Sequence, residues 1–249
     1  MKQILVVNDD GIHGPGLDPL ARALAKVGRV TVVVPDQEKS TASHYLTLHK
    51  PVRVKEIARR IYILNGNPAD CTRFGALSLL KGKVDLVVSG INKGLNLGDD
   101  VIYSGTVAAA IEANILGIPA LAVSQDLSRK DYFRTAAYFA EKIAKNILFH
   151  NHHLPKKICL NINVPACSAS NIRGIRIVKL GKRLYGRKVT ICIDPRGRPC
   201  FWLMDKKVGE IAIPGSDVEA VRKRYVSITP LSLDWTDTAM MPRLKKISW

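Results

Sequence analysis

Residues 4–11 read Ile-Leu-Val-Val-Asn-Asp-Asp-Gly, and this stretch near the start of the chain decides the fold. Its apolar half predicts a buried strand, and two adjacent carboxylates, Asp9 and Asp10, follow that strand directly. Because an unpaired buried carboxylate has a large desolvation cost, both are expected at the carboxyl end of the strand, facing water, a cation or both. Ligands bind at this edge of open α/β sheets. Asn-Asp-Asp-Gly taken alone fits an exposed turn with a helix cap equally well. Other segments of the sequence are needed to distinguish a ligand site from such a turn.

Strand-like and helix-like segments alternate through the first part of the chain. Apolar residues recur at the spacing of a helix face over residues 17–27, and residues 30–34 form a second apolar run that ends at a proline. Further buried strands are predicted at residues 84–88, 120–124 and 158–164, and further helices at residues 69–80, 107–116 and 131–148. This alternation predicts an α/β fold with a doubly wound, Rossmann-like and mostly parallel sheet.

The character of the chain changes after Pro165. Basic segments that favour β structure are separated there by glycines and prolines, which predicts hairpins outside the main sheet. The C-terminal segment carries apolar side chains that are unusual in a free tail, namely Trp235, Met240, Met241, Leu244 and Trp249. We expect one domain over residues 1–249, with the core sheet in about 1–165 and a projecting β-hairpin and a C-terminal arm in about 166–249.

Composition limits the class of protein. With 249 residues, 47% of them hydrophobic, the chain can bury one large α/β core without disulfide bonds. No apolar run approaches the roughly 18 to 20 residues of a membrane span, and residues 1–4 lead directly into a strand in place of a signal peptide. We therefore expect a cytoplasmic protein with no membrane partner. The cysteines are odd in number and scattered, without a Cys-x-x-Cys pair, and are expected to be reduced thiols: Cys71, Cys159, Cys167, Cys192 and Cys200.

Positive charge dominates the sequence, with 38 Lys and Arg against 21 Asp and Glu and a formal net charge of +17. Such a surface attracts anions, so phosphorylated substrates and nucleic acid are both candidate partners. The excess is concentrated between Arg173 and Arg198, where nine basic residues accompany a single acidic one, Asp194. A solvated hairpin is the simpler interpretation of that region, because no RRM, KH or helix-turn-helix signature accompanies it.

Residues 37–44 form a polar loop after the second predicted strand. Parallel strands present their carboxyl ends at one edge of the sheet, so this loop is expected beside Asp9 and Asp10. The hydroxyl groups of Ser40 or Ser43 are then candidates to reach the acidic pair. A serine in a loop is also a common turn residue, so the loop by itself does not establish a site.

Residues 89–106 form a second polar, glycine-rich segment that leads into a predicted helix. Ser104 is expected as the N-cap of that helix, with Gly105 and Thr106 in its first turn. Free backbone N–H groups and the positive end of the helix dipole favour an anion such as phosphate there. The alternative is that Ser104 only caps the helix. The segment matches neither the dinucleotide Gly-x-Gly-x-x-Gly motif nor a Walker loop, which argues against NAD and ATP.

Four motifs, in this order, resemble those of the SurE family, the survival-protein-E nucleotidases. They are Asn-Asp-Asp-Gly at residues 8–11, Pro-Asp-x-x-x-Ser at 35–40, the Ser-Gly-x-Asn-x-Gly-x-Asn-x-Gly-x-Asp-x-x-x-Ser-Gly-Thr-Val block at 89–107, and Tyr-Val-Ser-Ile-Thr-Pro-Leu at 225–231. The resemblance therefore spans nearly the whole chain. Asn67 stands where the family usually has Thr before Pro-Ala-Asp-Cys, and residues 173–198 are more basic than the resemblance leads us to expect. Both departures concern substrate preference more than chemistry.

The resemblance implies one divalent metal ion per subunit, Mg²⁺ or Mn²⁺, held by Asp9, Asp10, Ser40 and Asn92. It also implies that Asn96, Ser104, Gly105 and Thr106 surround the phosphoryl group, and that Asp9, Asn92 and Asn96 act in catalysis. Hard ions of this kind prefer oxygen ligands that include carboxylates. The chemistry of the ligand set therefore agrees with what the resemblance implies.

The implied activity is that of a 5′-nucleotidase, a metal-dependent phosphatase that hydrolyses nucleoside 5′-monophosphates to nucleoside and phosphate. Cleavage of 3′-monophosphates and short polyphosphate is left open, as is an aspartyl-phosphate mechanism in place of direct attack by water. The resemblance further implies a homodimer or homotetramer formed by exchange of the C-terminal arm. The alternative is a non-enzymatic nucleic-acid-binding protein that uses residues 173–198. If that charge only steers substrates, nucleic acid should bind weakly and electrostatically.

Overall fold

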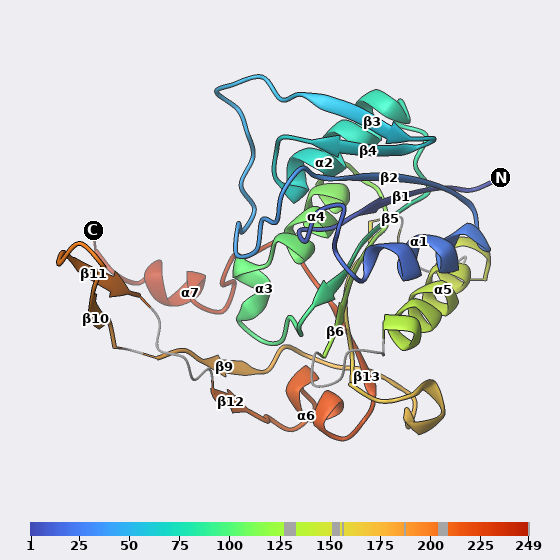
Figure 1. Ribbon diagram of the computed structural model, residues 1–249. Helices are drawn as coiled ribbons and strands as arrows, with labels where there is room; N and C mark the ends of the chain where they lie inside the picture. Colours follow the sequence, from blue (N-terminus) through green and yellow to red (C-terminus); the bar gives the residue numbers. More distant parts are fainter. Residues whose placement is uncertain (127–132, 151–154, 156, 187, 204–208, 249) are drawn as a thin grey trace.

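The computed structural model describes residues 1–126, 133–150, 155, 157–186, 188–203 and 209–248. Within these ranges, a nine-stranded sheet with the order β3-β4-β2-β1-β5-β6-β7-β13-β8 forms the centre of the molecule (Figure 1). Its strands are β1 (Gln3–Val7), β2 (Arg29–Pro35), β3 (Val54–Ala58), β4 (Ile61–Leu64), β5 (Leu86–Lys93), β6 (Ala120–Gln125), β7 (Cys159–Val164), β8 (Ile175–Ile177) and β13 (Val226–Pro230). The helices are α1 (Leu17–Ala25), α2 (Pro68–Phe74), the π-helical turn η1 (Gly75–Leu79), α3 (Asp100–Tyr103), α4 (Gly105–Ile115), α5 (Phe133–Phe149), the 3₁₀ turn η2 (Ala169–Asn171), α6 (Asp217–Arg222) and α7 (Met241–Leu244). The predicted start of α5 at residue 131 lies outside the described residues.

Most neighbouring strands of the central sheet run parallel. β1 pairs in parallel with β2 and with β5, and the parallel arrangement continues from β5 through β6 to β7. β3 runs antiparallel to β4 at one edge, and β13 runs antiparallel to β7 near the other. Because crossovers between parallel strands place helices on both faces, the predicted doubly wound α/β fold is confirmed.

The residues of β1 alternate between the two halves of the core. Ile4 and Val6 pack with α1 and α5 on one face of the sheet, and Leu5 and Val7 pack with α2 and α4 on the other. Figure 1 shows where these helices lie around the sheet. All four side chains are fully buried, because helices cover both faces. Asp9 follows two residues later, so it emerges at the carboxyl end of a strand that has no exposed face.

The central sheet extends past residue 165, so the prediction that later segments lie outside it is wrong for two strands. β13 pairs with β7, and β8 pairs with β13. Val226 and Ile228 of β13 are buried in the same hydrophobic cluster as α5. Burial of these side chains favours a place in the sheet over an exposed hairpin.

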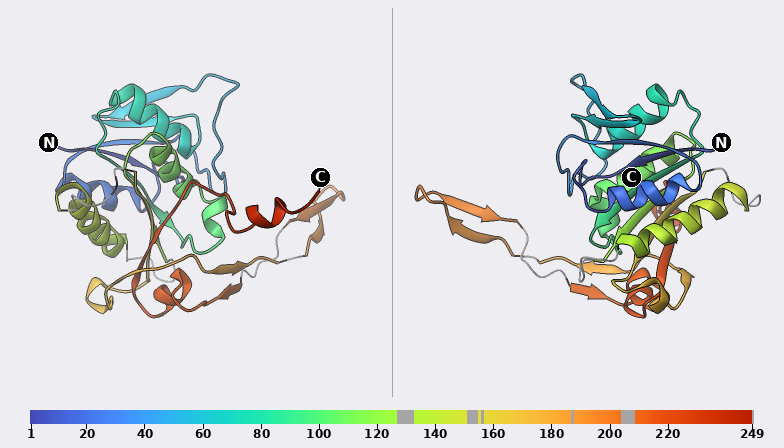
Figure 2. Two further views of the ribbon diagram at one scale, coloured as in Figure 1. Left: turned by 180° about the vertical axis from the view of Figure 1, so that it is seen from behind. Right: turned by 45° about the vertical axis from the view of Figure 1, so that its right-hand side comes forward.

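The segments between β8 and α6 leave the body of the molecule. β9 (Lys182–Leu184) pairs with β12 (Gly209–Ile211), and β10 (Thr190–Ile193) pairs with β11 (Pro199–Trp202) further out, both antiparallel. Figure 2 shows these strands projecting from the sheet, as expected for the predicted hairpin. Trp249 of the predicted arm lies outside the described residues. Among the described helices, none combines the length and apolar composition needed to cross a bilayer.

Cys192 and Cys200 are joined by a disulfide bond, so the expectation that all the cysteines are reduced thiols is wrong for this pair. The hairpin register places the two residues directly opposite each other, with their Cα atoms 5.2 Å apart, within the range that a disulfide requires. Their spacing in the sequence does not show this, because the pairing depends on where the hairpin turns. Cys71, Cys159 and Cys167 are free thiols, and the first two are buried.

Candidate metal and phosphate site

The loops after β1, β2 and β5 meet at one edge of the central sheet. β1 lies between β2 and β5, all parallel, with Val7 opposite Ser89, so the residues that follow these strands leave the sheet close together. The loop after β2 is tied to the acidic pair, because the Lys39 N–H donates to the Asp9 carbonyl oxygen at 2.7 Å. The structure therefore brings three polar segments of the sequence to one place.

Asp9 is 4% exposed and is held by the first turn of α4. The Thr106 hydroxyl donates to Asp9 Oδ1 at 2.5 Å. Gly105 passes so close that a Cβ atom there would lie 2.9 Å from Asp9 Cβ, so a larger residue would displace the carboxylate. The pKa of Asp9 is raised to about 6, mainly by burial, while the hydrogen bond from Thr106 lowers it and the charge of Asp10 raises it further. A nearby cation would stabilise the ionised form of such a carboxyl group.

Asp10 is partly buried, and burial is the main cause of its raised pKa. Its Oδ2 atom is buried without a hydrogen-bond partner among the described residues. The preceding Asn8 fixes the turn, since its side chain accepts from the Gly11 N–H at 3.1 Å and donates to the Gly11 carbonyl oxygen at 2.8 Å. Asn8 is itself buried, so the alternative of a merely exposed turn does not hold. An orphaned buried oxygen next to a second carboxylate fits a cation site.

Asn92 is placed by an irregularity in β5. The pairing of β5 with β6 shifts between Ser89 and Asn92, and Gly90 has a φ of +134°. A Cβ atom at Gly90 would lie 2.3 Å from the Val123 carbonyl oxygen, so this bulge requires glycine. Asn92 Nδ2 donates to the Gly94 carbonyl oxygen at 2.9 Å. The amide oxygen, Oδ1, is then the atom of Asn92 that suits a cation.

Asn96 is buried and is fixed by residues that the sequence analysis does not single out. Its N–H donates to Asn163 Oδ1 at 2.8 Å, and its carbonyl oxygen accepts from Asn161 Nδ2 at 2.8 Å and from Asn163 Nδ2 at 3.0 Å. Its side-chain Nδ2 donates to Ser124 Oγ at 2.7 Å. The pattern that points to Asn161 and Asn163 is their alternation within the apolar strand β7, because buried amides need partners.

Ser104 caps α4, since its Oγ accepts from the Val107 N–H at 3.1 Å. The N–H groups of Gly105 and Thr106 lie in the first turn, where a helix supplies no backbone partner, and the helix dipole favours an anion. The Thr106 side chain is fully buried and donates to Asp9. Only the backbone N–H of Thr106 is therefore available to an anion.

A cavity of about 470 Å³ opens at this edge of the sheet. It is lined by Asp9, Ser40, Thr41, Asn92, Lys93, Leu95, Asn96, Asp100, Tyr103, Ser104 and Tyr185. The cavity thus collects most of the predicted site residues, whereas Asp10, Gly105 and Thr106 are not part of its lining. Tyr103 and Tyr185 were not predicted from the sequence, because Tyr103 occupies an unspecified position of the motif at residues 89–107 and Tyr185 lies outside all four motifs.

The side-chain atoms near the cavity that could coordinate a cation are oxygens. Among the described residues, no group of three or more His, Cys, Asp and Glu side chains could hold a metal ion. Two carboxylates, an amide and a hydroxyl are available instead, from Asp9, Asp10, Asn92 and Ser40. Such a set suits a hard divalent cation, which takes oxygen ligands and keeps some of its waters. The orphaned Asp10 oxygen and the raised pKa of Asp9 both fit a cation at this place.

Known proteins are similar to this chain in sequence and fold over nearly its whole length. The family model described as Survival protein SurE matches residues 4–187. A Geobacter sulfurreducens protein named 5′-nucleotidase SurE is 46% identical over 247 residues, which cover 99% of this chain and 93% of that protein. A Pelobacter propionicus protein of the same name is 47% identical over 239 residues, 96% of each chain. The crystal structure of the SurE protein from Aquifex aeolicus is similar with a TM-score of 0.84 and 40% identity, over 98% of both chains.

These matches include the strands of the sheet edge, the loops of the cavity and the start of α4. The relatives are matched over more than nine-tenths of their own length, so the similarity is not confined to a shared motif. The chain belongs to the SurE family.

Proposed function

We propose that this chain is a metal-dependent 5′-nucleotidase that hydrolyses nucleoside 5′-monophosphates to nucleoside and phosphate. The observation that carries the proposal is that Asp9, Asn92, Asn96 and Ser104 line one cavity at the start of α4. Relatives named 5′-nucleotidase SurE, matched over nearly the whole chain, support the same activity. Nucleoside 3′-monophosphates and short polyphosphate are further candidate substrates of this cavity.

Asp9, Asp10, Ser40 and Asn92 would hold one divalent cation, Mg²⁺ or Mn²⁺. When bound, such an ion supplies Lewis-acid chemistry and neutralises phosphate charge. The two carboxylates balance the charge of the ion, and the neutral Ser40 and Asn92 add no further negative charge that would repel a phosphate. The Ser40 hydroxyl donates to Glu38 Oε1 at 2.7 Å, which leaves the lone pairs of its oxygen for a cation.

The start of α4 would bind the phosphoryl group, through Ser104 and the N–H groups of Gly105 and Thr106. Asn96 has a second side-chain N–H besides the one that donates to Ser124, and this donor would stabilise the charge that develops on the phosphoryl oxygens. The Thr106 hydroxyl acts through Asp9, because it fixes the carboxylate at Oδ1. Phosphoryl transfer depends mainly on such positioning and charge neutralisation.

Direct attack by water is the mechanism we favour over an aspartyl-phosphate. Asp9 Oδ1 already accepts a hydrogen bond from Thr106, which lowers the nucleophilicity of that oxygen. Stereochemistry at a chiral phosphorus distinguishes the two mechanisms, because one displacement inverts the configuration and two displacements retain it. Retention would therefore establish the covalent mechanism.

A phosphate-release panel tests the proposed function. Nucleoside 5′- and 3′-monophosphates, short polyphosphate and ribose 5-phosphate are each assayed with Mg²⁺, with Mn²⁺ and with EDTA. We expect release from 5′-monophosphates that EDTA abolishes and either ion restores. Activity that is indifferent to EDTA, or no release from any nucleoside monophosphate with either ion, would contradict the proposal.

Nucleic-acid binding by residues 173–198 has less support. Three of the nine cations of this region form ion pairs within the described part of the chain: Arg183 with Asp100 and Glu210, Lys182 with Asp99, and Arg198 with Asp194, at N–O distances of 2.8 to 3.0 Å. Arg187 lies outside the described residues. Paired cations attract the phosphates of a duplex less, so we propose that nucleic acid binds weakly and electrostatically.

We further infer that the projecting hairpin and the C-terminal arm join copies of this chain into a dimer or a tetramer. Ile191, Ile193, Phe201 and Trp202 of β10 and β11 are 57 to 67% exposed, and Trp235 of the arm is 77% exposed. Exposed apolar side chains gathered in this way mark protein interfaces. Both segments extend away from the central sheet (Figure 2), where a second copy can cover them.

A further inference from the structure

We propose that Tyr103 and Tyr185 form a platform on which the base of a nucleotide stacks, an inference that rests on the proposed function. Both side chains line the cavity that also contains Asp9, Asn96 and Ser104. The metal and phosphate chemistry of this cavity uses oxygen donors and N–H groups, and it gives the aromatic rings no role. A nucleoside monophosphate is a substrate that has both a phosphate for the polar end and a flat apolar ring for the aromatic end.

Tyr103 lies directly before the residues that would bind phosphate. It is the last residue of α3 and directly precedes Ser104, the N-cap of α4. Its carbonyl oxygen accepts from the Ser43 N–H at 3.0 Å, which fixes the backbone, yet the residue is 52% exposed. A large aromatic side chain exposed on the wall of a polar cavity gains free energy when a flat apolar group covers it.

Tyr185 comes from a distant part of the sequence and reaches the same wall. It follows β9, and its ring meets that of Tyr103 edge to face, with centroids 5.7 Å apart and planes at 84°. Two rings in this arrangement present surfaces that are nearly perpendicular to each other. A planar base that stacks on the face of one ring meets the other ring at the side, so both rings contribute contact area.

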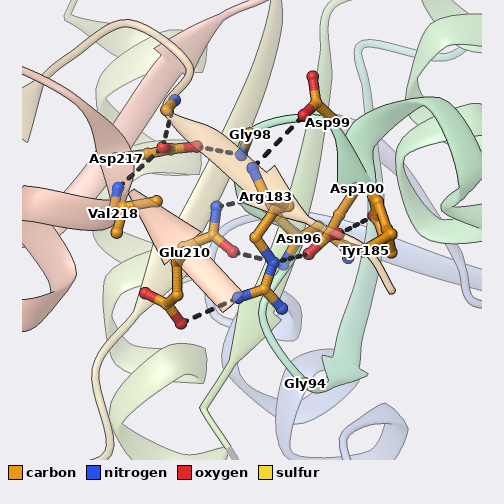
Figure 3. Close-up of polar contacts among 12 residues, drawn as sticks. Gly94, Asn96, Gly98, Asp99, Asp100, Arg183, Tyr185, Glu210, Asp217 and Val218 are labelled. Carbon is orange, nitrogen blue, oxygen red and sulfur yellow. Dashed lines mark hydrogen bonds and ion pairs between the residues drawn. The ribbon is translucent and has the colours of Figure 1, made fainter. Parts of the chain in front are cut away.

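A hydrogen bond and two ion pairs hold Tyr185 in position (Figure 3). Its hydroxyl donates to Asp100 Oδ1, Asp100 Oδ2 pairs with Arg183 Nε at 2.8 Å, and Arg183 Nη1 pairs with Glu210 at 2.9 Å. Burial and the hydrogen bond to Asp100 raise the pKa of Tyr185, so the hydroxyl remains a donor at neutral pH. Because the ring is already ordered, little conformational entropy is lost when a base binds.

Stacking predicts a particular selectivity. Every base has a π face, so a stacking platform tolerates different bases. Outside the phosphate end and the two rings, the cavity wall consists of Thr41, Lys93, Leu95 and Asp100. Asp100 already pairs with Arg183 and Tyr185, so few groups are left for reading the edge of a base. We therefore expect the site to distinguish nucleotides from other phosphate monoesters more strongly than it distinguishes one base from another.

Two substrates that differ only in the base test the platform: adenosine 5′-monophosphate and ribose 5-phosphate. For the wild-type enzyme, kcat/KM is expected to be about ten-fold or more higher for the nucleotide, the scale of one base–aromatic stack. Tyr103→Leu and Tyr185→Leu remove the ring but keep apolar volume. Each should raise KM for the nucleotide about ten-fold at unchanged kcat and leave ribose 5-phosphate kinetics as they are.

Tyr138→Leu is the matched control. Tyr138 is 50% exposed and pairs edge to face with Phe139, but it lies on α5 and is not part of the cavity lining. Its substitution should change the kinetics of neither substrate. Tyr103→Phe keeps the ring and should keep the preference for the nucleotide. A loss as large as that of Tyr103→Leu would overturn the platform, because the hydroxyl would then be the recognising group.

Other results would also overturn the platform: no preference of the wild-type enzyme for the nucleotide, equal effects of the leucine variants on both substrates, or no effect of either variant. Calorimetric binding of adenosine 5′-monophosphate in EDTA provides a readout without turnover. If the enzyme hydrolyses neither substrate, the proposed function fails, but ten-fold weaker nucleotide binding by Tyr103→Leu would still support the platform. Equal binding by wild type and variant would overturn it.

Discussion

At the sheet edge polar side chains are buried, whereas along the projecting hairpin apolar side chains are exposed. Asp9 and Asn96 are each held by hydrogen bonds from within the chain, with Thr106 and with Asn163. Trp202, in contrast, is 67% exposed on a two-stranded ribbon. The difference teaches that the kind of partner can be inferred from the side chains that lack a favourable environment within the chain. Buried carboxylates favour a cation, and exposed apolar side chains favour another protein surface.

The two regions are joined at the base of the hairpin. Asp217 accepts from the Gly98 N–H at 2.9 Å and from the Gly181 N–H at 2.7 Å, so it connects the loop before α3 to the segment that enters β9 (Figure 3). Tyr185 extends this connection into the cavity. A change in the hairpin can therefore reach the cavity through β9, and the predictions below separate the two regions.

Asp9→Asn should have the largest effect, because it removes a buried carboxylate from the sheet edge and leaves the hairpin intact. We expect phosphate release and Mn²⁺ affinity to fall on the order of 10³-fold. The metal-free variant should melt a few degrees higher, since a buried charge without a cation is lost. Steady-state kinetics, metal-binding calorimetry and thermal melts check these expectations.

Asp18→Asn is the control for that substitution, because Asp18 is an exposed residue of α1 that pairs with Arg22. It should change neither metal affinity nor turnover. Wild-type turnover by folded Asp9→Asn at low metal would show that the buried carboxylate does not serve the metal site.

Asn92→Ala should lower activity about 10²-fold without changing the charge of the site. If Asn92 is a ligand, a higher Mg²⁺ concentration should restore part of the activity, which a metal titration of the rate would show. Asn146→Ala, on the exposed surface of α5, is the control. A loss that no metal concentration restores would instead assign Asn92 to contact with the transition state.

Removal of residues 235–249 tests whether the C-terminal arm joins copies of this chain. Light scattering at micromolar concentration should give the full-length chain at least twice the mass of one chain, and the truncated chain a smaller mass. The double substitution Phe201→Ser and Trp202→Ser should also reduce the mass, because it removes exposed apolar surface from β11. A monomeric full-length chain would break the comparison, since the exposed side chains would then need no partner.

Glu112→Gln examines a buried charge whose partners lie within the chain. Glu112 is 1% exposed and pairs with His44 Nε2 at 2.9 Å and Arg73 Nη1 at 2.5 Å. Burial alone would raise the pKa of Glu112, but its hydrogen bonds with His44 and Arg73 lower it overall. A carboxyl group with a lowered folded pKa stabilises the fold above its unfolded pKa, and this contribution is lost as the pH falls through the folded pKa.

The variant should therefore lose about 2 kcal/mol of unfolding free energy at pH 7 and show a weaker decline of stability below about pH 4.5. Urea denaturation between pH 3 and pH 7 measures both effects. Glu141→Gln, which removes a pair with Lys26 near the surface, should change stability far less. An acid decline as steep as that of the wild type would show that Glu112 does not contribute to it.

Ionic strength should have the smallest effect and should act on the charged surface only. Raising salt from about 50 to about 500 mM is expected to raise KM for the nucleotide a few-fold while kcat changes little, because screening weakens long-range attraction. Binding of duplex DNA should be weak and should fall steeply over the same range. Sub-micromolar, sequence-selective DNA binding at physiological salt would support the nucleic-acid alternative instead.

The sequence by itself determined the parallel strands of the central sheet and the edge at which Asp9 lies. The apolar run of residues 4–7 followed by two carboxylates, and the alternation of strands with helices, are local patterns that predict a parallel sheet and the direction of each strand. Ser104 was likewise predictable as a cap, because capping depends on a few adjacent residues. The assignment of Asp10, Ser40 and Asn92 to a metal comes from the family resemblance and stays a prediction.

The tertiary structure alone decided which side chains complete the site. Thr106 and Asp9 are 97 positions apart, and Asn163 and Asn96 are 67 apart, so these contacts exist only after helices and strands have packed. Tyr185 reaches Tyr103 because β9 returns beside the loop before α3. The register of the β10–β11 hairpin brings Cys192 and Cys200 together for the disulfide bond. Burial of apolar side chains in the same cluster as α5 favours the place of β13 in the central sheet. Periodicity acts within one element, whereas these features depend on how separate elements pack against one another.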